Sequence, residues 1–300
     1  MTARLARYAA LSDAPADFCA AMARPLPRVI WANPLGRDVA ATAAEVRRLC
    51  PEAEPVGWRP ATWRLPTEAR PGRWLPWMLG DLHGHEEASI LAADLVGAQP
   101  GERILDLCAA PGGKSAVLAV ALADRGLLVA NDRKAGRLSA VRRTLDRLGV
   151  TCAAVTCGDG AVFPEISGGY DRVLVDAPCS CEGNRPQGAD EEATTERYRA
   201  VIIPVQKALL RRALRLVRPG GRVVYATCTF APEENEAVVE AASAEGFVVE
   251  PVAVPGLRLA PGLTAWAGTS FRPDMVHAVR LWPHHNNTGG FFVAVLRRTP

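Results

Sequence analysis

Residues 104–115 read ILDLCAAPGGKS, and this stretch decides the fold class. Its first residues form an apolar run typical of a buried strand, small residues then make a tight turn, and a helical pattern follows to about Asp124. In a doubly wound sheet a ligand binds beyond the carboxyl ends of the strands, where small residues let it approach the backbone and a helix N-terminus offers N–H groups. We therefore expect a cofactor at this turn.

A phosphate-binding P-loop is the main competing interpretation, because the stretch ends in Gly-Lys-Ser. That motif needs a glycine five residues before Gly113, and this chain has Cys108 there. Acidic residues also follow the next two predicted strands. Asp132 ends the second strand, where a ribose diol would lie, and Asp159 lies in a Gly-Asp-Gly turn after the third, near an adenine. Together they predict a ligand that contains adenosine.

Downstream of this turn, strand-like and helical patterns alternate along the chain. Helical patterns cover Ala135–Leu148, about Pro204–Val217 and about Glu233–Ala244, and apolar runs of strand length separate them. Such alternation predicts an α/β fold with a mostly parallel, doubly wound sheet that is buried on both faces. The last two apolar runs, VHAVRLW and GGFFVAVLRR, predict an antiparallel hairpin at an edge of the sheet.

The first 80 residues have a different pattern, with prolines spread throughout. The order helix, strand (RVIWAN), helix (Arg37–Leu49) and strand predicts a small α+β module that ends in an irregular connector rich in Pro and Trp. Tryptophans in such connectors cover the edges of a core more often than they stack on bases. We expect two domains, residues 1–80 and residues 81–300.

Composition is typical of soluble globular proteins, since 49% of the 300 residues are hydrophobic and 22% are charged. A net charge of +3 does not by itself indicate nucleic-acid binding, so an RNA site would need a local basic surface. No apolar run is long enough to cross a membrane and no export signal is evident, which predicts a cytoplasmic protein. The eight cysteines form no C-x-x-C pair, and the histidines lack companions at zinc-site spacing. Reduced thiols and no metal site are therefore expected.

Two cysteines follow the ends of predicted strands. The fourth strand ends at Asp176, shortly before Cys179, and the fifth ends just before Cys228, so both thiols are expected at the edge that carries the cofactor. A lone buried cysteine is usually a small apolar residue, but polar residues follow each of these two. A thiolate that adds to carbon 6 of cytosine makes carbon 5 nucleophilic toward the methyl group of S-adenosylmethionine. Asp176 is placed to hydrogen-bond the N3 and amine edge of such a base. The residues alone leave open which thiol attacks.

Four motifs occur in the order LDLCAAPGGKS, DAPCSCEG, YATCTFAPEENE and RLWPHHNNTGGFFVAVL. With them the chain resembles the Sun (Nol/Nop/Sun) family of RNA cytosine-5 methyltransferases, in particular its bacterial ribosomal RNA members, from about Arg28 to Arg298. The resemblance implies a Rossmann-like S-adenosylmethionine methyltransferase sheet whose last two strands are antiparallel, together with an N-terminal RNA-binding region. The implied partner is RNA, ribosomal rather than transfer RNA. We expect no membrane association and no obligate protein partner.

The resemblance also implies roles for individual residues. Cys228 of the Thr-Cys motif is the nucleophile that forms the covalent adduct with carbon 6, Cys179 of the Pro-Cys motif promotes release of the methylated RNA, and Asp176 is the third catalytic residue. The implied S-adenosylmethionine pocket is formed by Cys108, Ala109, Ala110, Pro111, Gly112, Gly113, Lys114, Asp132, Arg137, Asp159 and Asp176.

One loop departs from the family's pattern. Where the family often has Pro-Cys-Ser-Gly-x-Gly-Thr followed by basic residues, this chain has Cys181 in place of the first glycine and, further on, the acidic stretch QGADEEATTE. We expect Cys181 to be a packing residue, and RNA affinity to depend on the N-terminal module or on a partner. Two alternative functions are a non-catalytic ribosome-assembly factor that binds RNA and a transfer RNA cytosine-5 methyltransferase. DNA cytosine methylation shares the chemistry but usually takes its nucleophile from the Pro-Cys motif.

Overall fold

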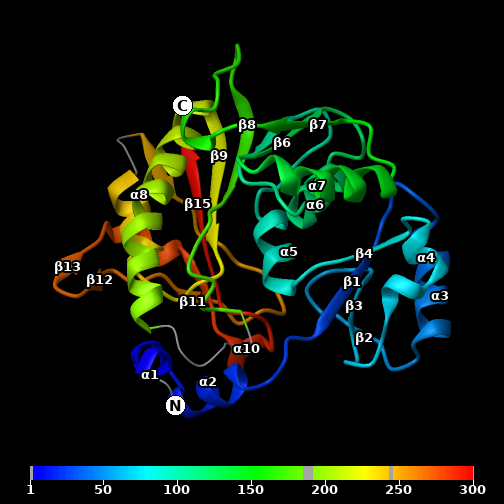
Figure 1. Cartoon of the computed structure of the whole chain (residues 1–300), viewed down its shortest axis with the longest axis horizontal. Coiled ribbons are helices and arrows are strands. Elements are labelled where there is room, and N and C mark those ends of the chain that lie inside the picture. Colours follow the sequence, from blue (N-terminus) through cyan, green and yellow to red (C-terminus); the bar gives the residue numbers. More distant parts are fainter. Residues whose placement is uncertain (1–2, 185–191, 243–245, 300) are drawn as a thin grey trace.

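The computed structural model describes residues 3–184, 192–242 and 246–299, and its centre is a large twisted sheet (Figure 1). Within the described residues the strand order is β11-β14-β15-β9-β8-β5-β6-β7, and β10 also pairs with β15. Strands β5 to β9 are parallel to one another, and the pairs that involve β10, β11, β14 and β15 are antiparallel. The strands are β5 (Arg103–Asp106), β6 (Leu127–Asp132), β7 (Ala153–Cys157), β8 (Tyr170–Asp176), β9 (Val217–Thr227), β10 (Phe247–Val249), β11 (Ala260–Pro261), β14 (Val279–Leu281) and β15 (Phe291–Arg298).

This sheet confirms the predicted α/β class and the antiparallel pairing of the last two strands. Residues 279–281 pair with residues 291–293 as the sequence suggested. The expected position at the edge is wrong, because β15 pairs with β9 along its other side and β11 lies outside β14. The long apolar run of β15 explains its central place, since a strand buried on both faces needs apolar residues at successive positions.

Helices cover both faces of the sheet. One core cluster joins α8 and α9 to one face, through residues such as Leu105 and Val223, and a second joins α5, α6 and α7 to the other, through Ile104 and Val224. Because neighbouring strand residues point to opposite faces, strands such as β8 and β9 contribute side chains to both clusters. The helices are α5 (Glu87–Asp94), α6 (Gly113–Ala121), α7 (Ala135–Arg147), α8 (Glu192–Leu216) and α9 (Glu236–Ala242), with the short turns η2 (Gly160–Val162), η3 (Pro273–His277) and α10 (Pro283–Asn286) and the small hairpin β12 (Ala265–Trp266) and β13 (Thr269–Ser270).

Two helix boundaries differ from those predicted. Helix α8 does not begin at Pro204 but at Glu192, and Pro204 lies inside it. A proline inside a helix removes one backbone hydrogen bond; packing of α8 against the sheet, with Leu209 and Leu210 almost fully buried, outweighs that loss. Helix α9 begins at Glu236 rather than near Glu233, because the residues before it form hydrogen bonds with the neighbouring loops. Its expected end at Ala244 lies outside the described residues.

The N-terminal module contains a second, antiparallel sheet in the order β2-β3-β1-β4. The predicted strand RVIWAN and the helix after it are confirmed, and strands β2, β3 and β4 follow where one strand and an irregular connector were expected. Residues 82–84 also pair with β1, so this sheet extends past residue 80. The elements are β1 (Arg28–Ala32), α3 (Val39–Leu49), β2 (Glu54–Pro55), β3 (Thr62–Leu65), η1 (Pro71–Arg73), α4 (Leu75–Met78) and β4 (Leu82–Gly84). Trp63 is buried within the module, and Trp31 is buried between the module and helices α5 and α6.

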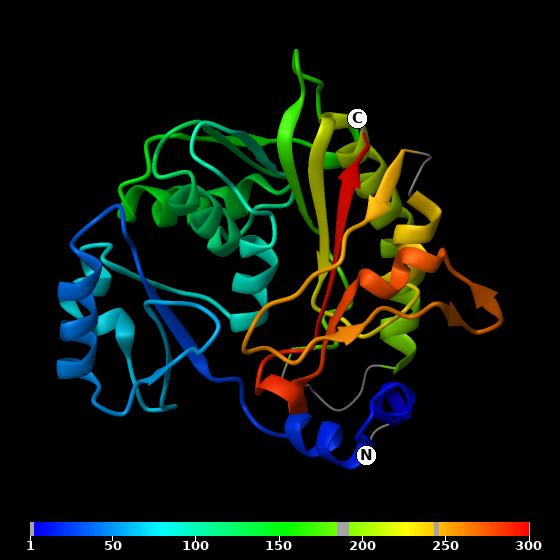
Figure 2. The ribbon, with the colours of Figure 1, turned by 180° about the vertical axis from the view of Figure 1, so that it is seen from behind.

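The first two helices, α1 (Ala3–Ala9) and α2 (Pro15–Met22), do not pack on the N-terminal sheet. Phe18 packs edge-on against Phe230 and Trp282, which stack on each other, and the centroid of its ring lies 5.2 and 5.5 Å from theirs. Both ribbon views place α1 and α2 near α10 and apart from α3 (Figures 1 and 2). The first two helices therefore pack beside the large sheet and not on the N-terminal module. No helix in the described ranges is long and apolar enough to span a membrane.

Candidate active site

Four neighbouring parallel strands end at one edge of the sheet and carry the residues that the sequence singled out. Strands β5 and β6 end at Asp106 and Asp132, and β8 ends at Asp176. Strand β9 ends at Thr227, directly before Cys228. The structure thus brings the cofactor loop, the acidic residues and both cysteine loops to the same edge, as a doubly wound sheet requires.

The loop between β5 and α6 is held by the acid at the end of β6. The Asp132 carboxylate accepts hydrogen bonds from the backbone N–H groups of Ala110 at 3.2 Å and Lys134 at 2.8 Å. Arg137 donates to the Ala110 carbonyl at 2.6 Å, and its guanidinium lies 3.6 Å from Asp132. Because each carboxylate oxygen accepts more than one hydrogen bond, Asp132 can still receive those of a ribose diol.

The two glycines of the loop are required by the protein itself. Gly112 has a φ of 110°, in the left-handed region that favours glycine, and caps the start of α6. A Cβ on Gly113 would lie 2.8 Å from the ring of His85, which fills the space beside the helix start. Close approach of a cofactor therefore explains only part of this motif, and packing explains the rest.

Asp159 and Asn131 shape the end of the site that was predicted to receive adenine. Asp159 is exposed, and one of its carboxylate oxygens accepts a hydrogen bond from the N–H of Ala161 at 3.0 Å. Asn131, which the sequence did not single out, is fully buried and donates to the carbonyls of Leu107 at 3.1 Å and Gly158 at 3.0 Å. It ties the cofactor loop to the Asp159 turn, and its position beside Asp132 was the only sequence signal for this role.

Lys114 links the cofactor loop to the fourth strand. Its buried ammonium donates to Asp176 Oδ2 at 2.7 Å. Burial is the largest single influence on the pKa of Lys114 and lowers it, but the charge and hydrogen bond of Asp176, together with the charges of Cys228 and Asp106, outweigh burial and the pKa is raised. Burial raises the pKa of Cys108, so this residue lines the loop as a neutral thiol. The Asp176 side chain is 29% exposed beside this ion pair.

Three sulfur atoms meet beyond the ends of β8 and β9. The Sγ atoms of Cys179 and Cys228 are 3.4 Å apart although the residues are 49 positions apart in the chain. The Sγ atom of Cys181 lies 4.0 Å from that of Cys179. Cys181 is exposed and has a φ of 57°, so the expectation that it packs in the interior is wrong. A left-handed turn after Ser180 directs its side chain to the site instead of the core.

The sulfurs determine one another's pKa values. Hydrogen bonds to Cys181 and Cys228, together with burial, raise the pKa of Cys179. For Cys228 the hydrogen bond with Cys179 lowers the pKa, but that with Cys181 and burial outweigh it, and the pKa is raised. Cys179 and Cys228 therefore rest as thiols at neutral pH, and either thiol has to lose its proton before its sulfur can act as a nucleophile.

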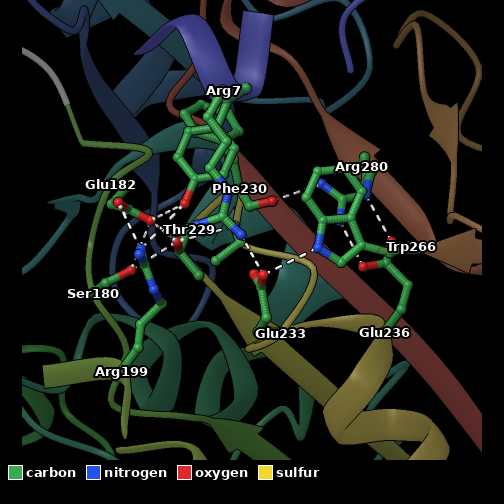
Figure 3. A network of polar contacts seen from close by, with 12 residues as sticks. Arg7, Ser180, Glu182, Arg199, Thr229, Phe230, Glu233, Glu236, Trp266 and Arg280 are labelled. Atoms are coloured by element: carbon green, nitrogen blue, oxygen red, sulfur yellow. Dashed lines mark hydrogen bonds and ion pairs between the residues drawn. The ribbon is translucent and has the colours of Figure 1, made fainter. Parts of the chain in front are cut away.

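A buried carboxylate that the sequence did not single out lies beneath both cysteine loops. Glu182 is 1% exposed, and its Oε2 accepts hydrogen bonds from the hydroxyls of Tyr8 at 2.6 Å and of Ser180 and Thr229 at 3.0 Å. Arg199 of α8 donates to Oε1 at 3.1 Å. Figure 3 shows Ser180, Thr229 and Arg199 converging on this carboxylate. Burial and the Glu182 charge raise the pKa of Tyr8, which keeps its hydroxyl a donor.

The polar stretch after Cys228 binds the same two loops. The carboxylate of Glu234 accepts hydrogen bonds from the N–H of Ser180 and from Gln206, both at 2.9 Å. The Asn235 amide donates to the carbonyl of Thr229 at 3.0 Å. The motif YATCTFAPEENE assigned no role to its last four residues. Their only sequence signal was a group of acids close to the second cysteine with no basic residue among them.

A buried ion pair completes the support of the second cysteine loop. Arg280 of β14 and Glu236 at the start of α9 are 3% and 0% exposed, and their closest atoms are 2.5 Å apart. Arg280 also donates to the carbonyl of Phe230 at 3.0 Å (Figure 3). The backbone that follows Cys228 is therefore fixed from β14 as well as from α8, which limits the movement of its sulfur.

The residues at this edge fit S-adenosylmethionine chemically. Carboxylates at the ends of β6 and β7 suit the ribose hydroxyls and the adenine amine, and the loop between Leu107 and Gly112 offers small side chains beside them. Beyond this loop, Lys114 and Asp176 form a polar boundary with the cysteines. The arrangement can hold an adenosine ligand on one side of that boundary and a base on the other.

Comparison with known proteins identifies relatives for nearly the whole chain. A family model described as "16S rRNA methyltransferase RsmB/F" matches residues 93–297. The chain is 31% identical over 299 residues to a tRNA (cytosine(49)-C(5))-methyltransferase of Pyrococcus abyssi, a match that covers 97% of this chain and 94% of the relative. It is 37% identical to the human 28S rRNA (cytosine(4447)-C(5))-methyltransferase, covering 70% of this chain and 26% of that protein. A solved methyltransferase homologue from Pyrococcus horikoshii superimposes with a TM-score of 0.83 at 27% identity, covering 95% and 90% of the two chains.

Proposed function

We propose that this chain, which belongs to the RsmB/F family of RNA methyltransferases, transfers a methyl group from S-adenosylmethionine to carbon 5 of a cytosine in RNA. The family membership confirms the resemblance to Sun-family enzymes seen in the sequence. The observation that carries the proposal for this site is the 3.4 Å separation of the Cys179 and Cys228 sulfurs next to the Lys114–Asp176 pair. It favours an active enzyme over a non-catalytic assembly factor, because a protein that only binds RNA has no need of two adjacent thiols beside a buried ion pair.

S-adenosylmethionine is the methyl donor of the family, and when bound it supplies an electrophilic methyl group. In our proposal Asp132 receives the ribose hydroxyls, Asp159 receives the adenine amine, and the backbone of residues 108–114 holds the remainder of the cofactor. Arg137 acts through the loop, because it bonds the Ala110 carbonyl.

The base is bound and activated by the residues on the other side. Asp176, held by Lys114, offers its remaining oxygen to the exocyclic amine of cytosine. The Cys228 thiol passes its proton to solvent and its sulfur adds to carbon 6, which makes carbon 5 nucleophilic. After methyl transfer a water molecule takes the carbon 5 proton, the C5–C6 double bond re-forms, and the C6–S bond breaks to return a thiolate on Cys228. The Sγ atom of Cys179 lies 3.4 Å from that sulfur, and we assign its thiol to this release step as a hydrogen-bond donor to the departing thiolate.

The proposed RNA is ribosomal, since the matching family model describes 16S rRNA methyltransferases. Exposed cations at the start of α7, Arg133, Lys134 and Arg137, lie beside the cofactor loop and suit a phosphate backbone. Transfer RNA is the second candidate, because the relative matched over almost its full length acts on tRNA, whereas the match spans only a quarter of the human rRNA enzyme. In either case we propose that the protein acts in the cytoplasm and that its N-terminal module contributes to RNA binding.

The cysteine roles are tested by methyl transfer from labelled S-adenosylmethionine to total RNA of a deletion strain. Cys228→Ala is expected to abolish transfer, and Cys179→Ala is expected to accumulate a slow-migrating, RNase-sensitive protein–RNA adduct. Cys152→Ala is the matched control, since Cys152 precedes β7 at the opposite edge of the sheet and should leave the rate unchanged. An active Cys228→Ala variant would refute the nucleophile, and turnover by Cys179→Ala without the adduct would refute the release role.

The RNA class is tested separately by bisulfite sequencing of ribosomal and transfer RNA from the deletion strain and its parent. The proposal expects one cytosine in ribosomal RNA to lose its methyl group. Loss at a tRNA cytosine alone would replace rRNA by tRNA as the substrate and leave the chemistry intact. Purified protein that methylates DNA but neither RNA would contradict the proposed function itself.

A further inference from the structure

The third sulfur at the active site has no role in the proposed methyl transfer. Cys179, Cys181 and Cys228 come from two loops, and their sulfur atoms all lie within 4.8 Å of one another. Cys181 adopts a φ of 57°, a conformation that a non-glycine residue adopts only with strain. Its thiol reaches the pair through this turn and also lies 3.4 Å from the carbonyl of Cys179.

The three sulfurs have the spacing of ligands around a tetrahedral metal ion. Zn²⁺ binds thiolates at about 2.3 Å in tetrahedral geometry, which places two sulfurs of one site about 3.8 Å apart. The separations of 3.4 Å and 4.0 Å from Cys179 to its two neighbours lie on either side of that value. Shifts of the sulfur atoms by a few tenths of an ångström are enough to reach that separation. Cys181 is exposed, which gives an ion a path to the buried Cys179.

We propose that Cys179, Cys181 and Cys228 form a binding site for Zn²⁺ or another thiophilic divalent ion, and that the bound ion switches off methyl transfer. Each cysteine that is still a thiol loses its S–H proton to solvent, and lone pairs of the three thiolate sulfurs bind the ion, with a water molecule as the fourth ligand and no change of oxidation state. The ion would occupy the sulfur of Cys228 and so block addition to cytosine. This inhibitory effect rests on the proposed function, whereas the metal binding does not.

A second group of potential ligands is a weaker candidate. The imidazoles of His284 and His285 both hydrogen-bond Asp13, at 2.9 and 2.8 Å. The other oxygen of Asp13 is already paired with Arg258 at 2.5 Å, and the charge of that guanidinium opposes a cation. A site with three thiolates also binds Zn²⁺ more tightly than a site with one exposed carboxylate and two imidazoles.

The test uses Co²⁺ as a spectroscopic probe and a chromophoric chelator to measure the Zn²⁺ affinity of the intact chain. The wild-type protein should give the sulfur-to-cobalt charge-transfer band of a three-thiolate site. Cys181→Gly, which suits a φ of 57°, should lose about one thiolate's share of that band and weaken Zn²⁺ binding about 100-fold, since each ligand contributes a comparable part of the binding free energy. Cys181→Ser preserves the size of the side chain and should behave in the same way.

His285→Asn is the matched control, because it removes the alternative cluster and leaves the three thiols. It should keep the wild-type spectrum and affinity. A Cys181→Gly spectrum and affinity equal to those of the wild type would overturn the proposal, as would loss of the band in His285→Asn alone. Zn²⁺ inhibition is then measured for each variant relative to its own metal-free rate, and Cys181→Gly should need about 100-fold more Zn²⁺. If the thiolate site is present but no metal-free variant methylates RNA, the proposed function fails and the metal site stands.

Discussion

Glu182→Gln tests whether the carboxylate beneath the two cysteine loops holds the reactive sulfurs in place. The change keeps the shape of the side chain but removes the negative charge that faces Arg199, whose side chain is only 9% exposed. The amide can turn its oxygen to Arg199 and its NH₂ to the hydroxyls of Tyr8, Ser180 and Thr229, which then have to accept instead of donate. All of the present hydrogen bonds to Oε2 would therefore be reversed or lost.

The expected effect on stability follows from the buried charge that remains. Breaking a buried ion pair by removing one partner lowers the free energy of unfolding by about 3–5 kcal/mol, and the isosteric amide places this variant near the lower limit. Urea denaturation should show a lower midpoint with an unchanged slope. Glu165→Gln is the control: its carboxylate is 67% exposed and pairs with Arg212 at 2.9 Å, so its loss should change stability by less than about 1 kcal/mol.

The expected effect on catalysis separates positioning from simple stabilisation. Glu182 bonds the residues that follow Cys179 and Cys228, so its loss should change the 3.4 Å separation of the two sulfurs. A displacement of about 1 Å at a reacting group reduces the rate about 100-fold. We expect kcat to fall by that factor at a temperature where the variant is fully folded, while KM for S-adenosylmethionine stays constant because the cofactor loop has other supports. A variant with wild-type kcat and stability would refute this reasoning.

Two further predictions concern the same edge of the sheet. Burial raises the pKa of Asp106 from 3.8 to about 7, so between these pH values the folded state binds a proton that the unfolded state has lost, and the stability of the wild type falls as pH rises. Asparagine does not titrate, so the free energy of unfolding of Asp106→Asn relative to that of the wild type should rise by roughly 3 kcal/mol between about pH 5 and pH 8. Equal pH profiles of the two proteins in urea titrations would contradict the assignment. Gly183→Ala would place a Cβ 2.0 Å from the carbonyl oxygen of Gly290, and this clash should lower the free energy of unfolding by about 2 kcal/mol. The variant should also have a lower kcat, because the N–H of Gly183 donates to the Cys228 carbonyl at 2.9 Å. Gly72→Ala, with no atom within 4 Å of the added Cβ, should change neither quantity.

The sequence alone determined the fold class and the composition of one edge of the sheet. Apolar runs of strand length alternating with helical patterns permit few arrangements, and in a doubly wound sheet the residues after successive strands meet at the same edge. The sequence therefore predicts Asp132, Asp176 and the two cysteines at one edge of the sheet, and the structure places them there. The four motifs, in their order along the chain, identified the family.

The tertiary structure alone decided how those residues are held. Glu182 bonds partners from α1 and α8, and Arg280 reaches Glu236 across 44 positions, contacts that no local pattern predicts because both partners are ordinary charged residues in the sequence. It also decided the place of Cys181: a left-handed turn carries the side chain to the other two sulfurs rather than into the core. The local pattern of apolar and polar residues indicates which face of a strand or helix is apolar, whereas the pairing of polar side chains depends on which distant segments pack together.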